Sequence, residues 1–179
     1  EKFAEMKPHI EFVVEQFFVP WGIEREKIRV IPGAVDVQKF AAKARPHPLL
    51  AAKGKKWIVS AKPLHKTNAA GISYVIKAMA RVAKKHPDWK YAIVGGGQGR
   101  PMLEALVKKL GLQKNVFFFG EMPNEQIPAV YSAAEIVVHS FAFKATTSIA
   151  LMESMAGGKA IVATASGEVR PTVAGTALL

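Results

Sequence analysis

The sequence contains no cysteine at any of its 179 positions. Disulfide bonds, thiolate nucleophiles and cysteine-ligated metal centres are therefore excluded. The chain also lacks an apolar run near the ~20 residues that a membrane-spanning helix needs, and it does not open with a signal-peptide pattern. These absences suit a reducing compartment. We expect a cytoplasmic protein, and peripheral contact with the inner face of the membrane remains an alternative.

Aspartate is scarce. Asp36 and Asp88 are the only two aspartates, and they do not form the closely spaced acidic pair that binds a divalent cation. The histidines do not have the spacing of a zinc site, and a Ser-His-Asp triad lacks a suitable acid. We therefore expect neither a metal nor a resident cofactor.

The sequence has a strongly basic block that contains almost no acidic residues. The net charge is +11, and residues 41–103 hold thirteen Lys or Arg side chains against the single acid Asp88. Such a block indicates either an anionic partner, such as phosphates, nucleic acid or an acidic membrane surface, or a solvated basic face. Few aromatic side chains accompany the bases, so nucleic-acid binding ranks last among these interpretations.

Five apolar segments predict the strands of one sheet. They are "KKWIVSA", "WKYAIVGGG", "NVFFFG", "EIVVHS" and "KAIVAT", and helical segments stand between them. Apolar strands that alternate with helices are typical of an α/β fold, here a doubly wound, Rossmann-like parallel sheet covered on both faces. Ligands bind such sheets at the carboxyl ends of the strands. The segment "KIRVIP", residues 27–32, predicts a further short strand.

Glycines follow the second of these strands in "VGGGQGRP", residues 94–101. Backbone N–H groups of Gly96 and Gly97 could approach a phosphate, or the loop could be a tight turn without a ligand. The dinucleotide pattern G-x-G-x-x-G/A fails, because Arg100 occupies the sixth position from Gly95. An enzyme that uses a nicotinamide or flavin cofactor is disfavoured.

A carboxylate stands within the apolar stretch "SIALMESMA", residues 148–156. Thr146, Thr147 or Ser148 can cap a helix there that ends at Gly157 and Gly158, and its apolar residues on all sides predict burial. A buried Glu153 needs a partner. That partner is either a Lys side chain or the hydroxyls of a ribose whose phosphates sit at the helix start.

Other polar residues also follow predicted strands. Lys62 and Lys66 come after "WIVSA" and could hold a diphosphate or belong to a solvated loop. His139 closes "EIVVHS" and is expected to be hydrogen-bonded or exposed rather than catalytic. Glu121 follows "VFFFG" and is either a loop acid or a ligand contact.

Taken in order, "RVIPGAVDVQKF", "WIVSAKPLHK", "YAIVGGGQG", "NVFFFGEMPNEQIPAVYSAAEIVVHS" and "IALMESMAGGKAIVAT" resemble the C-terminal, donor-binding domain of glycosyltransferase family 4. The resemblance covers nearly the whole chain. It implies a GT-B fold, with residues 1–27 as a helix that links to an N-terminal domain and residues 28–179 as the nucleotide-sugar-binding domain, cut short at its end. The implied reaction is retaining, metal-independent transfer of a hexose from a UDP-, ADP- or GDP-sugar, for which this fragment alone is inactive.

The resemblance assigns roles to single positions. Glu153 matches the second glutamate of the E-x7-E motif, which holds the ribose, and Lys66 matches the lysine that contacts the diphosphate, with Lys62 beside it. Phe119 to Met122, including Glu121, fall where backbone groups meet the base. Thr147 and Ser148 fall where backbone groups meet phosphate and sugar. The acceptor, a sugar, lipid or protein, would bind through the N-terminal domain.

The chain departs from the family pattern at several ligand positions. Ala145 replaces the first glutamate of the motif, Ala61 replaces an arginine, and Ala165 and Arg170 replace two acids. A second hypothesis follows from these departures. It is a non-catalytic domain that keeps the GT-B fold for interaction or regulation.

Overall fold

The computed structural model describes residues 14, 18–29, 34–41, 45–51, 55–142, 148–165 and 169–173. Five strands form one all-parallel sheet in the order β3-β2-β1-β4-β5. Their bounds are β1 (Lys56–Ala61), β2 (Trp89–Val94), β3 (Val116–Gly120), β4 (Ala134–His139) and β5 (Ala160–Ala163). Each corresponds to one of the five predicted apolar segments, so the predicted doubly wound α/β fold is confirmed.

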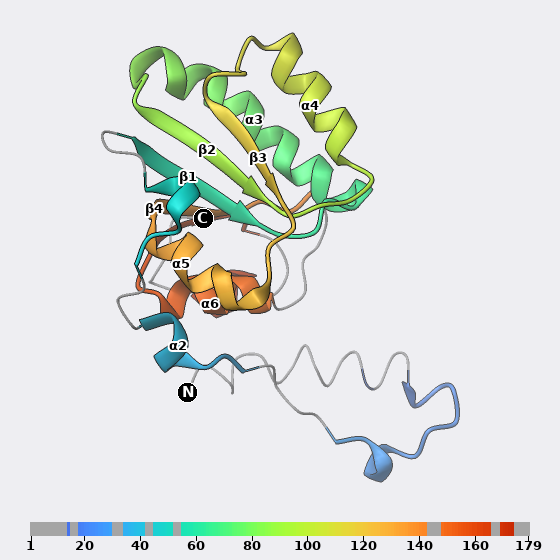
Figure 1. Ribbon diagram of the computed structural model, residues 1–179. Coiled ribbons are helices and arrows are strands. Elements are labelled where there is room, and N and C mark those ends of the chain that lie inside the picture. The colour runs from blue at the N-terminus through green and yellow to red at the C-terminus, as the bar shows by residue number, and fades with distance from the viewer. Residues whose placement is uncertain are drawn as a thin grey trace.

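Helices cover both faces of this sheet (Figure 1). On one face lie α3 and α4, and on the other lie α5 and α6, with α2 packed against α6. The bounds are α2 (Val37–Ala41), η3 (Pro48–Leu50), α3 (Lys66–Lys85), α4 (Arg100–Lys109), η4 (Asn124–Gln126), α5 (Ile127–Ser132), α6 (Ile149–Ala156) and α7 (Val169–Val173). No helix in the described ranges is long and apolar enough to cross a membrane.

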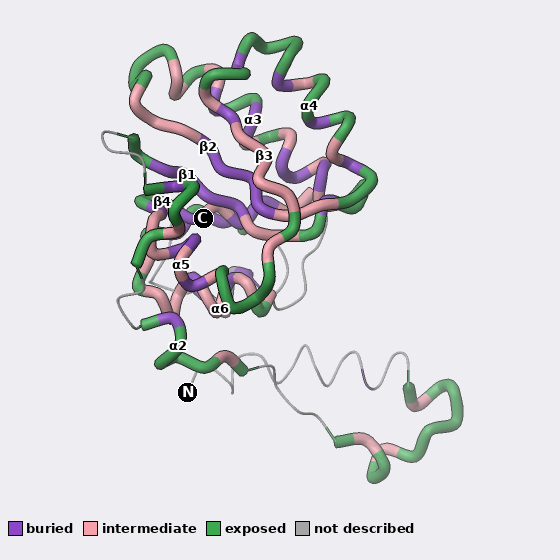
Figure 2. The backbone as a smooth tube through the Cα atoms, in the orientation of Figure 1, coloured by how far each residue is buried: buried purple, intermediate pink, exposed green. Residues whose placement is uncertain are grey.

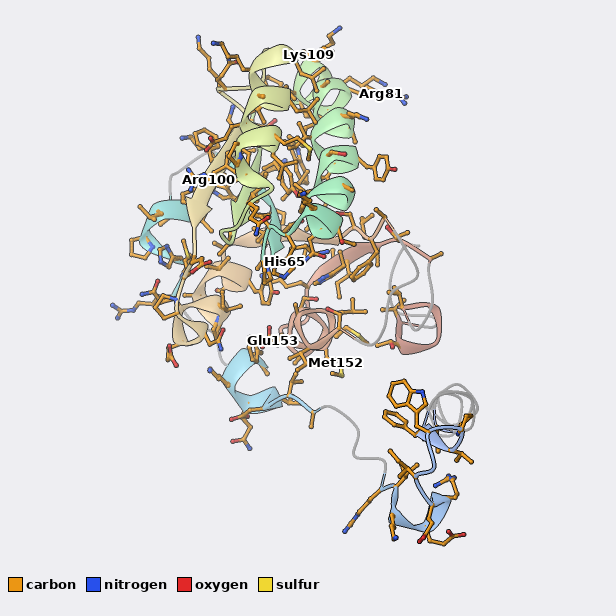
Figure 3. The ribbon with its side chains drawn as sticks, turned by 90° about the vertical axis from the view of Figure 1, so that its right-hand side faces the viewer. His65, Arg81, Arg100, Lys109, Met152 and Glu153 are labelled. Carbon is orange, nitrogen blue, oxygen red and sulfur yellow. The ribbon has the colours of Figure 1, made fainter. Side chains whose placement is uncertain are left out.

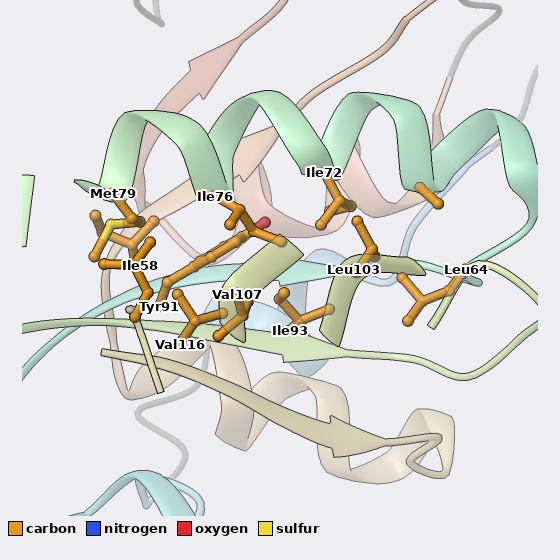
Figure 4. Packing of buried hydrophobic residues seen from close by; sticks show 12 residues of the cluster. Ile58, Leu64, Ile72, Ile76, Met79, Tyr91, Ile93, Leu103, Val107 and Val116 are labelled. Carbon is orange, nitrogen blue, oxygen red and sulfur yellow. The ribbon is translucent and has the colours of Figure 1, made fainter. Parts of the chain in front are cut away.

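Alternation along the strands divides the core into two layers. Ile58 of β1 and Tyr91 and Ile93 of β2 pack against Ile72 and Ile76 of α3 (Figure 4). The intervening strand residues point the other way, toward α5 and α2, where Val59, Val94, Val130 and Tyr131 are buried together. Successive strand side chains point to opposite faces. Because both sets are apolar, β1 and β2 are continuous apolar runs. Figure 2 shows these two strands mostly buried, with exposed positions on the surrounding helices.

The strand order reverses at β1, which pairs with β2 on one side and β4 on the other. The loops that leave β1 and β4 therefore diverge to opposite faces, and a crevice opens between them. All five strands end at the same edge because they are parallel. The polar residues predicted to follow the strands are thus brought to one edge of the molecule.

Two boundaries differ from the sequence prediction. The prediction of a strand over residues 27–32 is wrong at its start, because Lys27 is the last residue of a short 3-10 helix, η2 (Arg25–Lys27). Residues 30–32 lie outside the described residues. The segment with η2 lies apart from the sheet (Figure 1). In addition, the apolar periodicity of "GISYVIKAMARVAKKH" predicts a helix that starts at Gly71, whereas α3 begins five residues earlier, at Lys66. The predicted linking helix falls mostly on residues 1–17, of which only residue 14 is described, so its role stays a prediction.

Candidate functional site

A cleft of about 400 Å³ opens at the carboxyl edge of the sheet, between the loops after β1, β2 and β3 and the helices α5 and α6. Figure 3 looks onto this edge, with His65, Arg100 and Glu153 placed around it. Five residues predicted from the sequence line the cleft: Lys62, Gly96, Glu121, Met122 and Glu153. Segments from three separate strand ends and one helix thus converge on one cavity.

Three other predicted residues do not line the cleft, and a fourth cannot be placed. Lys66 is the first residue of α3 and is exposed. Ser148 is the N-cap of α6, and its Oγ accepts a hydrogen bond of 3.4 Å from the Leu151 N–H. Gly97 packs against the loop after β1. Thr147 and Ala145 lie outside the described residues. Contact between these residues and a ligand stays a prediction.

Lys62 is held by the end of β4. Its Nζ donates a 2.7 Å hydrogen bond to the Ser140 carbonyl oxygen and lies 4.2 Å from the centre of the Phe141 ring. Burial lowers the pKa of this amine to about 8. A partly desolvated cation in a cleft is suited to a phosphate, because a ligand charge replaces the solvation that burial removes.

Glu153 stands one turn and a half into α6, on the side that faces the cleft (Figure 3). Its carboxylate makes no ion pair with a Lys or Arg in the described part of the chain, so the ion-pair alternative gains no support there. Burial raises the pKa of this carboxyl group, and the charge of Lys39 acts in the opposite direction. A half-buried carboxylate without a protein partner can accept hydrogen bonds from a ligand's hydroxyl groups.

The prediction that α6 is buried on all sides is wrong. Ile149 is 56% exposed, and only Leu151 and Ser154 of this helix are buried. The reason is that α6 packs its buried side on β5 and α7, while Ile149, Ala150 and Glu153 border the open cleft. The apolar sequence of α6 therefore reflects a cavity wall as well as a core.

The glycines after β2 have a structural requirement. Gly95 and Gly97 have φ angles of 136° and 139°, which disfavour any residue with a Cβ. A Cβ on Gly95 would also collide with the Lys62 carbonyl oxygen, and one on Gly97 would lie 2.8 Å from the Leu64 carbonyl. The glycine loop is thus a turn packed on the loop after β1. Of its glycines, Gly95 and Gly96 line the cleft.

Several lining residues escaped prediction, among them Tyr131, Asn124 and Ile127. The Tyr131 hydroxyl donates a 3.4 Å hydrogen bond to the Ala150 carbonyl oxygen. Burial, followed by the Glu153 charge, raises the pKa of the Tyr131 phenol. Nothing in the sequence distinguishes Tyr131 from a core residue, because Tyr131 and its neighbour Val130 are both apolar in character and both are buried in α5.

His139 is buried and hydrogen-bonded, as one of the two sequence expectations has it. Across the described ranges, His, Asp and Glu side chains do not gather in a group of three that could hold a metal ion. The polar side chains that line the cleft include the Lys62 amine, two carboxylates, the Asn124 carboxamide and the Tyr131 hydroxyl.

Sequence comparison finds that the chain is similar to glycosyltransferases. The family model described as "Glycosyl transferases group 1" matches residues 43–176. A D-inositol 3-phosphate glycosyltransferase from Corynebacterium kroppenstedtii is 30% identical over 127 residues, which is 62% of this chain and 28% of that protein. The chain thus spans less than a third of this relative's length.

Solved structures show the same fold. The C-terminal domain of a glycosyl transferase group 1 family protein (LpcC) from Francisella tularensis is 30% identical with a TM-score of 0.61, covering 75% of this chain and 72% of that one. Anabaena HepE, solved with UDP and glucose, is 21% identical with a TM-score of 0.68, covering 84% of this chain and 41% of that one. From the match over residues 43–176, we conclude that the chain belongs to the group 1 glycosyl transferases, as a C-terminal domain of the GT-B fold.

Proposed function

We propose that the cleft is the donor site of a retaining, metal-independent hexosyltransferase that uses a nucleoside-diphosphate sugar. One observation carries the proposal: the Lys62 amine, from the loop after β1, and the Glu153 carboxylate, from α6, line the same cavity. A cation and an anion in one cleft match a ligand that has phosphates at one end and ribose hydroxyls nearby. Anabaena HepE, whose structure holds UDP and glucose, supports this kind of donor.

In this proposal, Lys62 stabilises the negative charge that builds up on the departing diphosphate. The acceptor's hydroxyl oxygen bonds to the sugar's anomeric carbon while the bond from that carbon to the phosphate oxygen breaks on the same face. The hydroxyl proton passes to the leaving phosphate oxygen, so the nucleoside diphosphate leaves as the other product. Glu153 contributes by holding the ribose, which positions the donor. The acceptor would be presented by a further domain.

Isothermal titration of this chain with UDP, GDP and ADP tests donor binding. At least one nucleotide should bind, and K62Q should weaken it about tenfold, the effect of losing one hydrogen bond to a charged group. K77Q is the matched control, since Lys77 is an exposed α3 residue outside the cleft lining. If none of the three nucleotides binds at millimolar concentration, the donor-site proposal is wrong.

A non-catalytic, regulatory domain is the second candidate, and Ala61 favours it. Ala61 lines the cleft at the position where the family resemblance implies an arginine, so one phosphate contact is missing from the described wall. A sugar-transfer assay on the protein with its N-terminal domain separates the two candidates. Nucleotide binding without transfer would favour the regulatory function, and transfer would exclude it.

A further inference from the structure

Glu121 is the second carboxylate of the cleft, and it comes from the loop after β3, whereas Glu153 comes from α6. The strand order β3-β2-β1-β4 places the loop after β3, which carries Glu121, two strands away from β1 and Lys62. Adjacent strands lie ~4.8 Å apart, so this separation is roughly 10 Å across the sheet edge. A nucleotide with phosphates near Lys62 and ribose at Glu153 therefore has its base within reach of the loop after β3.

The Glu121 side chain is packed on Gly96 at the cleft wall. A Cβ on Gly96 would lie 2.8 Å from Cγ and 2.9 Å from Oε1 of Glu121. The carboxylate thus occupies the space that any other residue at position 96 would fill. Over the part of the chain that the structure describes, the Glu121 carboxylate has no hydrogen-bond or ion-pair partner, so both oxygens remain available as acceptors.

A carboxylate imposes a strict requirement on the base it faces. It accepts hydrogen bonds and donates none when ionised. Guanine presents two adjacent donors, N1–H and the 2-amino group, which match the two carboxylate oxygens. Uracil presents one N–H between two carbonyl oxygens, which the carboxylate repels. Adenine presents an amino group beside a ring nitrogen that is itself an acceptor.

We propose that Glu121 selects guanine, so that the donor is a GDP-sugar. This inference rests on the proposed function, because it assumes that the cleft binds a nucleoside diphosphate. Hydrogen bonds between a carboxylate and two N–H donors are charge-assisted and stronger than neutral ones. Met122, the next lining residue, adds apolar contact at the same end of the cleft.

Titration of this chain with GDP, IDP, UDP and ADP tests the selection. GDP should bind at least about tenfold more tightly than UDP or ADP, as one charged hydrogen bond predicts. IDP, which lacks the 2-amino group, should fall between GDP and the other two. Glu121→Gln should weaken GDP about tenfold while leaving UDP within roughly twofold.

Two further variants separate the position of the carboxylate from its charge. Gly96→Ala keeps the carboxylate but displaces it from the wall, because the added methyl takes its place and the Glu121 side chain is free to rotate. It should reduce the GDP preference as Glu121→Gln does. Glu125→Gln is the matched control, since this exposed acid of the same loop removes the same charge without lining the cleft.

The outcomes are distinct. If wild type binds UDP or ADP as tightly as GDP, guanine selection is wrong and the donor-site proposal stands. If the GDP preference survives Glu121→Gln unchanged, the base is read by another group and the role of Glu121 is wrong. If no nucleotide binds at all, the donor-site proposal itself fails.

Discussion

His139 and Ser154 join β4 to α6 through a hydrogen bond of 2.9 Å between Nε2 of the imidazole and Oγ of the serine, and both side chains are buried. The Ser154 hydroxyl donates to the Leu151 carbonyl oxygen at 2.8 Å, so it accepts from His139. We therefore assign the proton to Nε2 of a neutral imidazole. The neighbouring Ser140 carbonyl holds Lys62. The end of β4 thus fixes both α6, which carries Glu153, and the amine of the cleft.

The burial of His139 predicts loss of stability in acid. Burial, followed by the charge of Lys62, lowers the pKa of His139 from 6.5 to about 3. Above pH 6.5 the imidazole is neutral in both states, so the stability is fully present. As the pH falls from 6.5 toward 3, the unfolded chain binds a proton that the folded chain does not. The free energy of unfolding should then decrease by about 1.4 kcal/mol per pH unit.

Urea unfolding at several pH values between 7 and 4 measures this slope. Other groups titrate in the same range, so the comparison is with His139→Gln, which keeps an N–H donor for Ser154 and does not titrate. In the variant, the free energy of unfolding should decrease less steeply with falling pH, by about 1.4 kcal/mol per pH unit, which corresponds to one proton. His86→Gln is the control for removing an imidazole at an exposed position. Equal slopes for wild type and His139→Gln would contradict the burial of a neutral imidazole.

Nucleotide binding should weaken at alkaline pH because of Lys62. Its amine is charged below a pKa of about 8 and loses that charge above it. The phosphate groups keep a constant charge in this range, since their second pKa is ~6. The dissociation constant for a nucleoside diphosphate should therefore rise by up to about tenfold per pH unit above pH 8. Titrations from pH 7 to 9.5 measure it, and a flat profile in wild type would exclude Lys62 as the phosphate ligand.

The fold was predictable from the sequence because the central strands, β1 and β2, are buried on both faces over most of their length. Val59 and Ile58, on opposite faces of β1, are both buried, and that burial demands the continuous apolar runs that mark the strands. The start of α3 was less predictable. Lys66 to Ala70 carry no amphipathic pattern, and this turn is set partly by the Asn68 side chain, which donates a 2.8 Å hydrogen bond to the Pro63 carbonyl oxygen.

The site was only partly predictable for a related reason. The position of Lys62 after a predicted strand indicated that it could be a site residue. Glu153 was indicated by its charge within an apolar helix. The contacts that orient them join residues far apart in sequence, such as Lys62 with Ser140, 78 positions later. Such contacts depend on strand order and side-chain direction, which no local pattern records. The packing of Glu121 on Gly96 belongs to the same class, because it joins loops after two different strands.

Glu153 should recognise the ribose of the nucleotide. Its carboxylate has no ion-pair partner in the described ranges, so its oxygens can accept hydrogen bonds from the 2′ and 3′ hydroxyls. Glu153→Gln should weaken a nucleoside diphosphate about tenfold and its 2′-deoxy analogue by less. The four titrations form a double-mutant cycle whose coupling energy measures the contact. Zero coupling, with equal weakening of both ligands, would mean that Glu153 does not contact the 2′ hydroxyl.

Gly71 of α3 should not tolerate a side chain, although alanine is intrinsically better in a helix by about 1 kcal/mol. A Cβ at Gly71 would lie 2.5 Å from the Ser140 carbonyl oxygen and 2.9 Å from its carbon. These are backbone atoms at the end of β4, and the same carbonyl accepts the Lys62 hydrogen bond, so neither can shift without cost. Gly71→Ala should lower the free energy of unfolding by roughly 1–3 kcal/mol, as overpacking does. Urea unfolding checks this against Thr67→Ala, an exposed α3 position where stability should hold or rise. A Gly71→Ala variant as stable as wild type would show that α3 and β4 do not approach this closely.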